Sequence, residues 1–418
     1  MEDKKERKTG KTVFAIVSVA ILFVYFSLLT FLHYNQAFYT TTGRFESDLF
    51  AHIEMALDGW GYSIMAVILR IFSLLPGNAF YFAVALFLAF CGIETIVLSF
   101  YFTKKYTDDS KLSFVISIMA AFVMPMFVQS VQPYRYVGYQ SPSIWHNSTY
   151  IVMKVGALAS LYIYFLISEK YKESMRIIDV VLFSILLALT TSVKTNFVLA
   201  FAPAALLFLI IDALSGVEIK RIIICALTIL PSRGVMAFQK YVLFGSETGN
   251  SIIIDPLYSV YLRTDKPYIT MILSAAFPVA VFLYNIFGVL KDTLRDFKEK
   301  RGIKSHRVFL FMWTMWFSAF MMLLLLRETG ARELDDNFAW GYDFALFGVF
   351  LIGLVYFSRN IKRVYNLFFD KDIESKNTLE KVTGICYVAM TLAILFYHLY
   401  CGVLFFIRLL GGATFFMY

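Results

Sequence analysis

The chain has 418 residues, of which 59% are hydrophobic and 18% are aromatic, and its mean hydropathy is +0.68. A soluble domain of this length could not cover so much apolar surface, so the composition excludes a soluble protein and predicts an all-α polytopic membrane protein. A net charge of +8 would suggest nucleic acid as a partner of a soluble protein. We expect no nucleic acid here, because in a membrane protein the distribution of charge between loops matters more.

The chain begins with a polar, basic segment, 1–11, which is followed by an apolar run from Thr12 to Phe31. This run is too long for the core of a signal peptide, and no small-residue cleavage site follows it. We therefore expect the run to be retained as the first membrane helix.

The segment 34–77 is predicted to form the first extracytoplasmic loop. It carries Glu46, Asp48, His52 and Glu54 within nine residues, although only 16% of the chain is charged. Asp48 and His52 are four residues apart and would share one face of a helical turn. The pattern indicates a clustered acidic site, and an ordinary solvated loop with a helix start near Asp48 is the alternative.

A short amphipathic run follows from Gly61 to Gly77, in which Ser63, Arg70 and Ser73 recur at helical spacing among large apolar residues. This pattern is typical of a helix that lies in the membrane interface instead of crossing the bilayer. We expect this interfacial helix to hold the acidic cluster at the membrane surface, and we take Arg70 as a candidate substrate-binding residue.

Apolar runs of spanning length predict about eleven transmembrane helices in a single transmembrane domain that comprises residues 1–418. The runs lie at 12–33, 79–102, 112–132, 150–167, 177–193, 196–214, 219–244, 270–290, 308–326, 343–358 and 383–410. The run 219–244 contains Pro231, Arg233 and Gly234, which predict a broken helix that faces protein or water.

The orientation follows from the basic residues. With the N-terminus in the cytoplasm, the inner segments contain 26 of the 38 Lys and Arg residues, and these segments are 1–11, 103–111, 168–176, 215–221, 291–307 and 359–381. Cytoplasmic loops are enriched in Lys and Arg. We therefore expect a multi-pass protein of the plasma (cytoplasmic) membrane with a cytoplasmic N-terminus and an extracytoplasmic C-terminus.

The predicted outer segments are rich in aromatic and cationic side chains. The candidates for substrate binding among them are Trp145, His146, Lys154, Lys194, Arg263, Arg327 and Arg332. Lys194 is the strongest of the cations, because a charge between two apolar runs is costly to retain. Enrichment of Tyr and Trp at membrane interfaces and snorkelling of Lys and Arg to lipid headgroups are the ordinary explanations of the same pattern.

These residue types suit the transfer of a sugar from a polyprenyl-phosphate donor. Phosphate is a good leaving group, so the reaction needs a carboxylate base for the acceptor hydroxyl and no general acid. Cations would hold the phosphate and stabilise the charge that it gains, so we expect Lys194 and at least one other outer cation to share a site. We assign Asp48 as the base, with Glu46 as its catalytic neighbour and His52 as a hydrogen-bonding partner. No cofactor is expected, and two carboxylates are too few to argue for a metal.

The order of these features resembles the GT-C superfamily of membrane glycosyltransferases. The matching phrases are the first helix, the acidic Glu46-Ser-Asp48 in an outer loop, the interfacial helix and the many further crossings. Ser-Asp-Leu-Phe-Ala-His52, Ser-Pro-Ser-Ile-Trp-His-Asn-Ser-Thr149, the turn at Lys194 and Asp336-Asn-Phe-Ala-Trp-Gly-Tyr342 look like bacterial membrane proteins of this type that are linked to surface polysaccharide. The resemblance implies a GT-C-like fold, a polyprenyl-phosphate-linked sugar donor and a catalytic aspartate at Asp48.

The expected activity is therefore transfer of a sugar to a glycan or lipid-linked acceptor on the extracytoplasmic face, in contact with membrane lipids. A polymerase or ligase of polysaccharide repeat units and a transporter of lipid-linked sugars remain as alternatives. A transporter should show paired repeats and ionisable groups near the bilayer midplane. Most ionisable groups outside the inner segments lie at outer helix ends, and Arg233 is the main exception.

Overall fold

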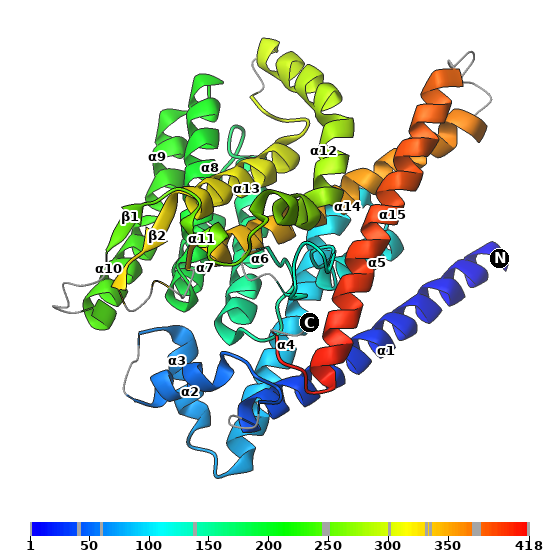
Figure 1. The fold of residues 1–418 in the computed structure, drawn as a ribbon. Coiled ribbons are helices and arrows are strands. Elements are labelled where there is room, and N and C mark those ends of the chain that lie inside the picture. The colour runs from blue at the N-terminus through cyan, green and yellow to red at the C-terminus, as the bar shows by residue number, and fades with distance from the viewer. Residues whose placement is uncertain are drawn as a thin grey trace.

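A computed structural model describes residues 2–39, 43–58, 62–136, 140–244, 251–299, 302–330, 333, 337–369 and 378–415. Within these residues the fold is a bundle of α-helices with one two-stranded antiparallel ribbon (Figure 1). The helices are α1 (Glu2–Phe38), α2 (Leu49–Leu57), α3 (Ile64–Phe72), α4 (Asn78–Thr107), α5 (Ser110–Ala121), α6 (Ser148–Ser168), α7 (Ile177–Val193), α8 (Asn196–Leu214), α9 (Ile219–Leu227), α10 (Leu230–Phe244), α11 (Tyr258–Tyr261), α12 (Pro267–Lys298), α13 (Arg307–Leu325), α14 (Asn337–Phe369) and α15 (Thr378–Leu410). The strands are β1 (Ile252–Ile254) and β2 (Leu326–Glu328).

The structure shows an all-α polytopic membrane protein. In the part of the chain that is described, nine helical stretches are long and apolar enough to cross a membrane, with α9 and α10 counted as one stretch. Two further apolar helices, α5 and α7, are shorter. Each of the eleven apolar runs that the sequence predicts overlaps at least one of these helices.

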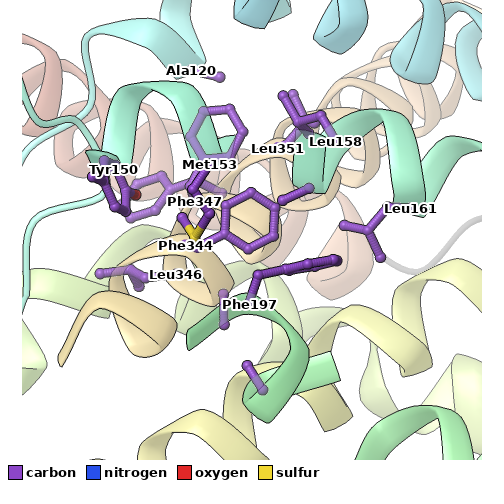
Figure 2. Close-up of a cluster of buried hydrophobic side chains, with 14 of the residues drawn as sticks. Ala120, Tyr150, Met153, Leu158, Leu161, Phe197, Phe344, Leu346, Phe347 and Leu351 are labelled. Carbon is purple, nitrogen blue, oxygen red and sulfur yellow. The ribbon is translucent and has the colours of Figure 1, made fainter. Parts of the chain in front are cut away.

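Helix α14 is the central element of the bundle. Of its most apolar stretch, 89% is buried, compared with 11% for α1. Its side chains meet those of α6 and α8 in a core of large apolar groups that includes Met153, Phe197, Phe344 and Phe347 (Figure 2). A helix that is apolar on every side is stable only when neighbouring helices or lipid surround it, and here protein surrounds it.

Segments predicted to share a membrane face lie together in the structure. At one end, which we call the Asp48 end, contacts join α2, the start of α6 and the loop between α7 and α8; these contacts are Asp48–Asn147 and Lys194–Thr149. At the other end, the Arg307 end, the contacts are Lys105–Glu169, Arg307–Asp212 and Arg359–Tyr106. The helices therefore run between two distinct ends, as alternating crossings require.

One predicted crossing is only partly helical. Helix α5 ends at Ala121 instead of continuing through 132, and residues 123–128 form neither helix nor strand. Twelve helical residues rise about 18 Å, which is short of a hydrocarbon core of about 30 Å.

Backbone and side-chain groups of α12 and α15 hold the segment 123–128. The Met124 N–H donates to the carbonyl of His398 (3.3 Å), and His398 Nδ1 donates to the carbonyl of Met124 (2.6 Å). The Met126 N–H donates to the carbonyl of Leu273 on α12 (3.1 Å). Non-helical backbone is tolerated at membrane depth only where protein satisfies its polar groups, and these contacts do so.

The loop 34–77 contains two short helices, α2 and α3, instead of the single interfacial helix that the sequence predicts. Helix α3 begins after Ser63, whose hydroxyl caps the Ala66 N–H, and it buries Met65 and Leu69 while it exposes Ile71. Arg70 Nε donates to the carbonyl of Ala56 (2.7 Å) and so ties α3 to α2.

The predicted break in 219–244 is also present. The helix is interrupted at Thr228 and Ile229, and α10 restarts at Leu230, so Pro231 lies in the first turn, where its missing N–H costs little. The sequence did not predict the ribbon, in which Ile252 pairs with Glu328 and Ile254 with Leu326.

The backbone that directly follows α5 packs very closely against Gly402 on α15. A Cβ atom at Gly402 would lie 1.6 Å from the carbonyl oxygen of Phe122, so Gly402→Ala must displace that backbone. We expect this change to destabilise the protein by about 1–3 kcal/mol or more, in the range of overpacked cores. Thermal unfolding of detergent-solubilised protein measures the effect.

Gly288→Ala on α12 is the matched control, because its Cβ would meet nothing within 4 Å. We expect it to unfold at the wild-type temperature or above, since alanine favours helix over glycine. Equal unfolding temperatures for the two variants would contradict the close approach of segment and helix.

Candidate functional site

The candidate site is built on an irregular segment, 140–147, that directly precedes α6. Its residues are buried although they form no helix. The side chain of Gln140 lies against Thr270 and Ser274 of α12. Buried irregular backbone needs hydrogen-bonding partners, and the next two residues obtain theirs from charged side chains.

Two buried ionisable side chains, Lys154 and Asp343, hold the segment through its backbone. Asp343 Oδ1 on α14 accepts from the N–H of Ser141 (2.9 Å), and Lys154 Nζ on α6 donates to the carbonyl of Pro142 (3.0 Å). The Lys154 ammonium also lies 3.5 Å from the ring centroid of Phe347. Hydrogen bonds and the ring face offset the cost of removing these charges from water.

Asn147 joins this segment to the acidic loop. It caps α6, since its Oδ1 accepts from the Tyr150 N–H (2.8 Å). Its Nδ2 donates to Asp48 Oδ2 (2.6 Å), and the Asp48 N–H donates to the carbonyl of His146 (3.1 Å). Asp48 lies immediately before α2 and remains half-buried, so its carboxylate is held in place yet accessible.

His52 and Lys194 complete the cluster around Asp48. His52 lies one turn along α2, and its Nδ1 is 2.7 Å from Ser148 Oγ. Lys194 follows α7, donates to Thr149 Oγ1 (3.1 Å) and lies 4.3 Å from the ring centroid of Trp340. The first turn of α6 therefore orients both side chains, and we call Asp48, His52, Asn147 and Lys194 the Asp48 cluster.

The two histidines of this region are neutral at physiological pH. The pKa of His52 is lowered to about 4 by burial and by the Lys194 ammonium, against the opposing effect of the Asp48 carboxylate. Burial is also the main cause that lowers the pKa of His146 to about 4. His146 stacks on Phe415 with ring centroids 4.3 Å apart. Burial raises the pKa of Tyr136, which packs edge-on against His146, well above its usual value.

The other residues singled out from the sequence take different positions. Glu46 is exposed, and Arg70 serves the α2–α3 contact. Trp145 is 4% exposed and donates to the Tyr25 hydroxyl (3.0 Å) in an aromatic core, so its ring packs in the interior. Arg263 lies close enough to Tyr136 to influence its ionisation.

Arg327 belongs to a separate group beside the ribbon. Its guanidinium pairs with Asp255 (3.0 Å) and Glu333 (2.9 Å) and covers the Tyr258 ring. Two carboxylates therefore compensate its charge within this group. Arg332 lies outside the described residues.

Three residues of this region were not singled out from the sequence: Asn147, Trp340 and Asp343. Asn147 directly precedes a long apolar run, which is the usual signal of a helix N-cap, so its capping role was readable. No local pattern indicates that Asp343 contacts a segment some 200 residues earlier in the chain. That contact depends on the packing of α14 beside α6.

No family model matches the sequence, and no curated protein and no solved structure matches the chain. Within the described ranges, no three His, Cys, Asp or Glu side chains come together in a group that could hold a metal ion. The chemistry of the site must therefore be argued from its own residues.

Burial of neutral histidines predicts a dependence of stability on pH. The folded-state pKa values of His52 and His146 lie below the value of about 6.5 for an unfolded chain. Their contribution is fully present above about pH 6.5 and is lost as the pH falls toward 4, because the unfolded chain then binds more protons. We expect the unfolding temperature to fall across this window, with His146 contributing up to about 3 kcal/mol.

His146→Phe tests this assignment, since it keeps a ring against Phe415 but cannot bind a proton. The unfolding temperature of the variant should depend less steeply on pH between 6.5 and 4 than that of the wild type. Parallel curves for the two proteins would show that His146 does not cause the dependence.

Proposed function

We propose that the protein is a membrane glycosyltransferase that transfers a sugar from a polyprenyl-phosphate donor to a glycan or lipid-linked acceptor. The observation that carries the proposal is the Asp48 carboxylate, which is fixed by Asn147 and lies in one cluster with the Lys194 ammonium. A base for the acceptor and a cation for the phosphate are the two groups that this reaction needs.

The step balances with these groups alone. The acceptor oxygen bonds to the anomeric carbon while the bond between that carbon and the phosphate oxygen breaks. The acceptor proton passes to Asp48, and polyprenyl phosphate leaves with the electron pair. Lys194 stabilises the charge that the phosphate gains, and neutral His52 offers a hydrogen bond without competing for the acceptor proton.

The surroundings of the Asp48 cluster suit a lipid-linked donor. Helices α2 and α3, which follow Asp48 in the chain, expose Leu57, Val67 and Ile71, and Leu74 is exposed just after α3; exposed apolar side chains on such short helices suit the membrane interface. A polyprenyl chain in the bilayer would then reach Asp48 with its phosphate end at the surface.

The buried charges Lys154 and Asp343 do not favour a transporter. A transport path would use such ionisable groups to bind and release its cargo near the midplane. Here both contact the backbone of the segment 140–147 and so hold the loop that carries Asn147. Their role in the proposed enzyme is to support the site.

The first test is product formation by Asp48→Asn with a lipid-linked sugar and an acceptor. The variant keeps an oxygen that can accept from Asn147 but loses the base, so turnover should fall by about 10²–10⁴-fold. Glu46→Gln is the control, because Glu46 is exposed and its loss should cost much less. Turnover of Asp48→Asn near the wild-type value would remove Asp48 from the mechanism.

We further propose that the Asp48 end faces outward and that both the N-terminus and the Arg307 end face the cytoplasm, in an eleven-crossing GT-C-like arrangement. The excess of basic residues in the segments at the Arg307 end supports this orientation. A membrane-impermeant thiol reagent added to intact cells should label Asp265→Cys but not Ser305→Cys; both positions are exposed. Labelling of Ser305→Cys alone would reverse the orientation.

A further inference from the structure

Asn147 uses every polar atom of its side chain. Its Oδ1 accepts from the Tyr150 N–H (2.8 Å) and from Thr149 Oγ1 (2.8 Å), and its Nδ2 donates to Asp48 Oδ2 (2.6 Å). The residue is only 3% exposed. Its amide is therefore fixed by α6 on one side and directs its N–H toward the carboxylate on the other.

The contact makes the two oxygens of Asp48 unequal. Oδ2 is occupied by Asn147, while Oδ1 accepts no hydrogen bond from any residue in the described ranges. The backbone adds a second restraint, because the Asp48 N–H donates to the carbonyl of His146 (3.1 Å). A single oxygen of a half-exposed carboxylate is thus left for a substrate.

The choice of asparagine is informative. Aspartate or serine would cap α6 as well as asparagine does, but an ionised aspartate has no donor, and the single hydroxyl of serine is one bond shorter than the amide nitrogen of asparagine. Capping alone therefore leaves the identity of residue 147 unexplained, whereas the contact with Asp48 needs a second polar atom that donates and has the reach of the amide nitrogen. The same contact occupies the nitrogen that glycosylation of the sequon Asn147-Ser-Thr149 would use.

We infer that Asn147 is a positioning residue that orients Asp48 and reserves its Oδ1 for the acceptor hydroxyl. This inference rests on the proposed function, since it assigns to Asp48 the role of base. Asn147 does not touch the reacting atoms and acts through the carboxylate that it holds.

Other titratable and charged groups lie near Asp48 and can also affect the pH dependence of its activity. His52 lies on α2, which begins directly after Asp48. His146 and Tyr136, which precede Asn147 in the chain, interact electrostatically with Asp48, and Lys194 lies in the loop after α7. None of these groups is changed by a substitution at Asn147. A shift in the pH–rate profile on such a substitution therefore reports on the contact itself.

The experiment compares Asn147→Asp and Asn147→Ser with the wild type, and all three keep an N-cap for α6. In Asn147→Asp two carboxylates meet at the position of the present hydrogen bond and share a proton, so the acid limb of the kcat profile should move up by at least about 1 pH unit. Asn147→Ser should lower kcat about 10-fold or more, with little change in KM or unfolding temperature, because the base is no longer oriented.

Infrared spectra of protein with isotope-labelled aspartate give a readout without turnover. At neutral pH, Asn147→Asp should show a protonated carboxyl band that is absent from the wild type and from Asp48→Asn/Asn147→Asp, in which an amide again faces the carboxylate. Absence of this band, or an unchanged kcat profile, would overturn the inference. If Asp48→Asn instead keeps full turnover while the band appears, the contact stands and the proposed function fails.

Discussion

The structure depends on satisfying backbone that is not helical inside a membrane protein. Between α5 and α6 the described residues 122–136 and 140–147 are not helical, and 140–147 are buried. In a bilayer each unsatisfied N–H or C=O costs several kcal/mol. The chain meets this cost with partners from four helices, and the positions of Lys154, Asp343 and His398 follow from that requirement.

Six of the charged and aromatic residues in and around the candidate site fall into two groups. Lys154, Asp343 and Trp145 are almost completely buried and support the segment 140–147. Asp48, His52 and Lys194 are half-buried. In the enzyme that we propose, a carboxylate that is fixed from a rigid, buried support would need no reorganisation during the reaction, which is how preorganised sites gain their rate.

The membrane class and the positions of the helical runs could be predicted because hydropathy and helix length reflect a local property of the chain. The grouping of Asp48, His52 and a short helix within 34–77 was also readable, since these features are close in sequence. The end of α5 at Ala121 was not predicted, although Pro125 is a signal for it: proline has no N–H to donate within a helix and disfavours the helical conformation of the residue before it. The place where the chain then packs could not be read from the sequence, because it depends on the close approach of the Phe122 carbonyl to Gly402 on α15.

The candidate site could also be predicted only where the signal is local in the sequence. Lys194 was found because its charge interrupts an apolar region, a signal that does not depend on tertiary structure. Trp145, by contrast, has the composition of a sugar-binding residue but the environment of a core residue. The sequence alone cannot separate these roles, because the burial of Trp145 depends on the packing of α1 and α15 around it.

The hydrogen bonds between the segment 123–128 and α15 also constrain biosynthesis. His398 lies 274 residues after Met124, so a ribosome that adds about 5–20 residues per second needs roughly 15–50 seconds to make the partner. During that interval the backbone of 123–128 must remain near water, within the insertion machinery or against transient partners. The first half of the bundle thus cannot reach its final state before the last helix enters the membrane. A nascent chain arrested before α15 would expose the unsatisfied backbone N–H and C=O groups of 123–128 to cellular quality control.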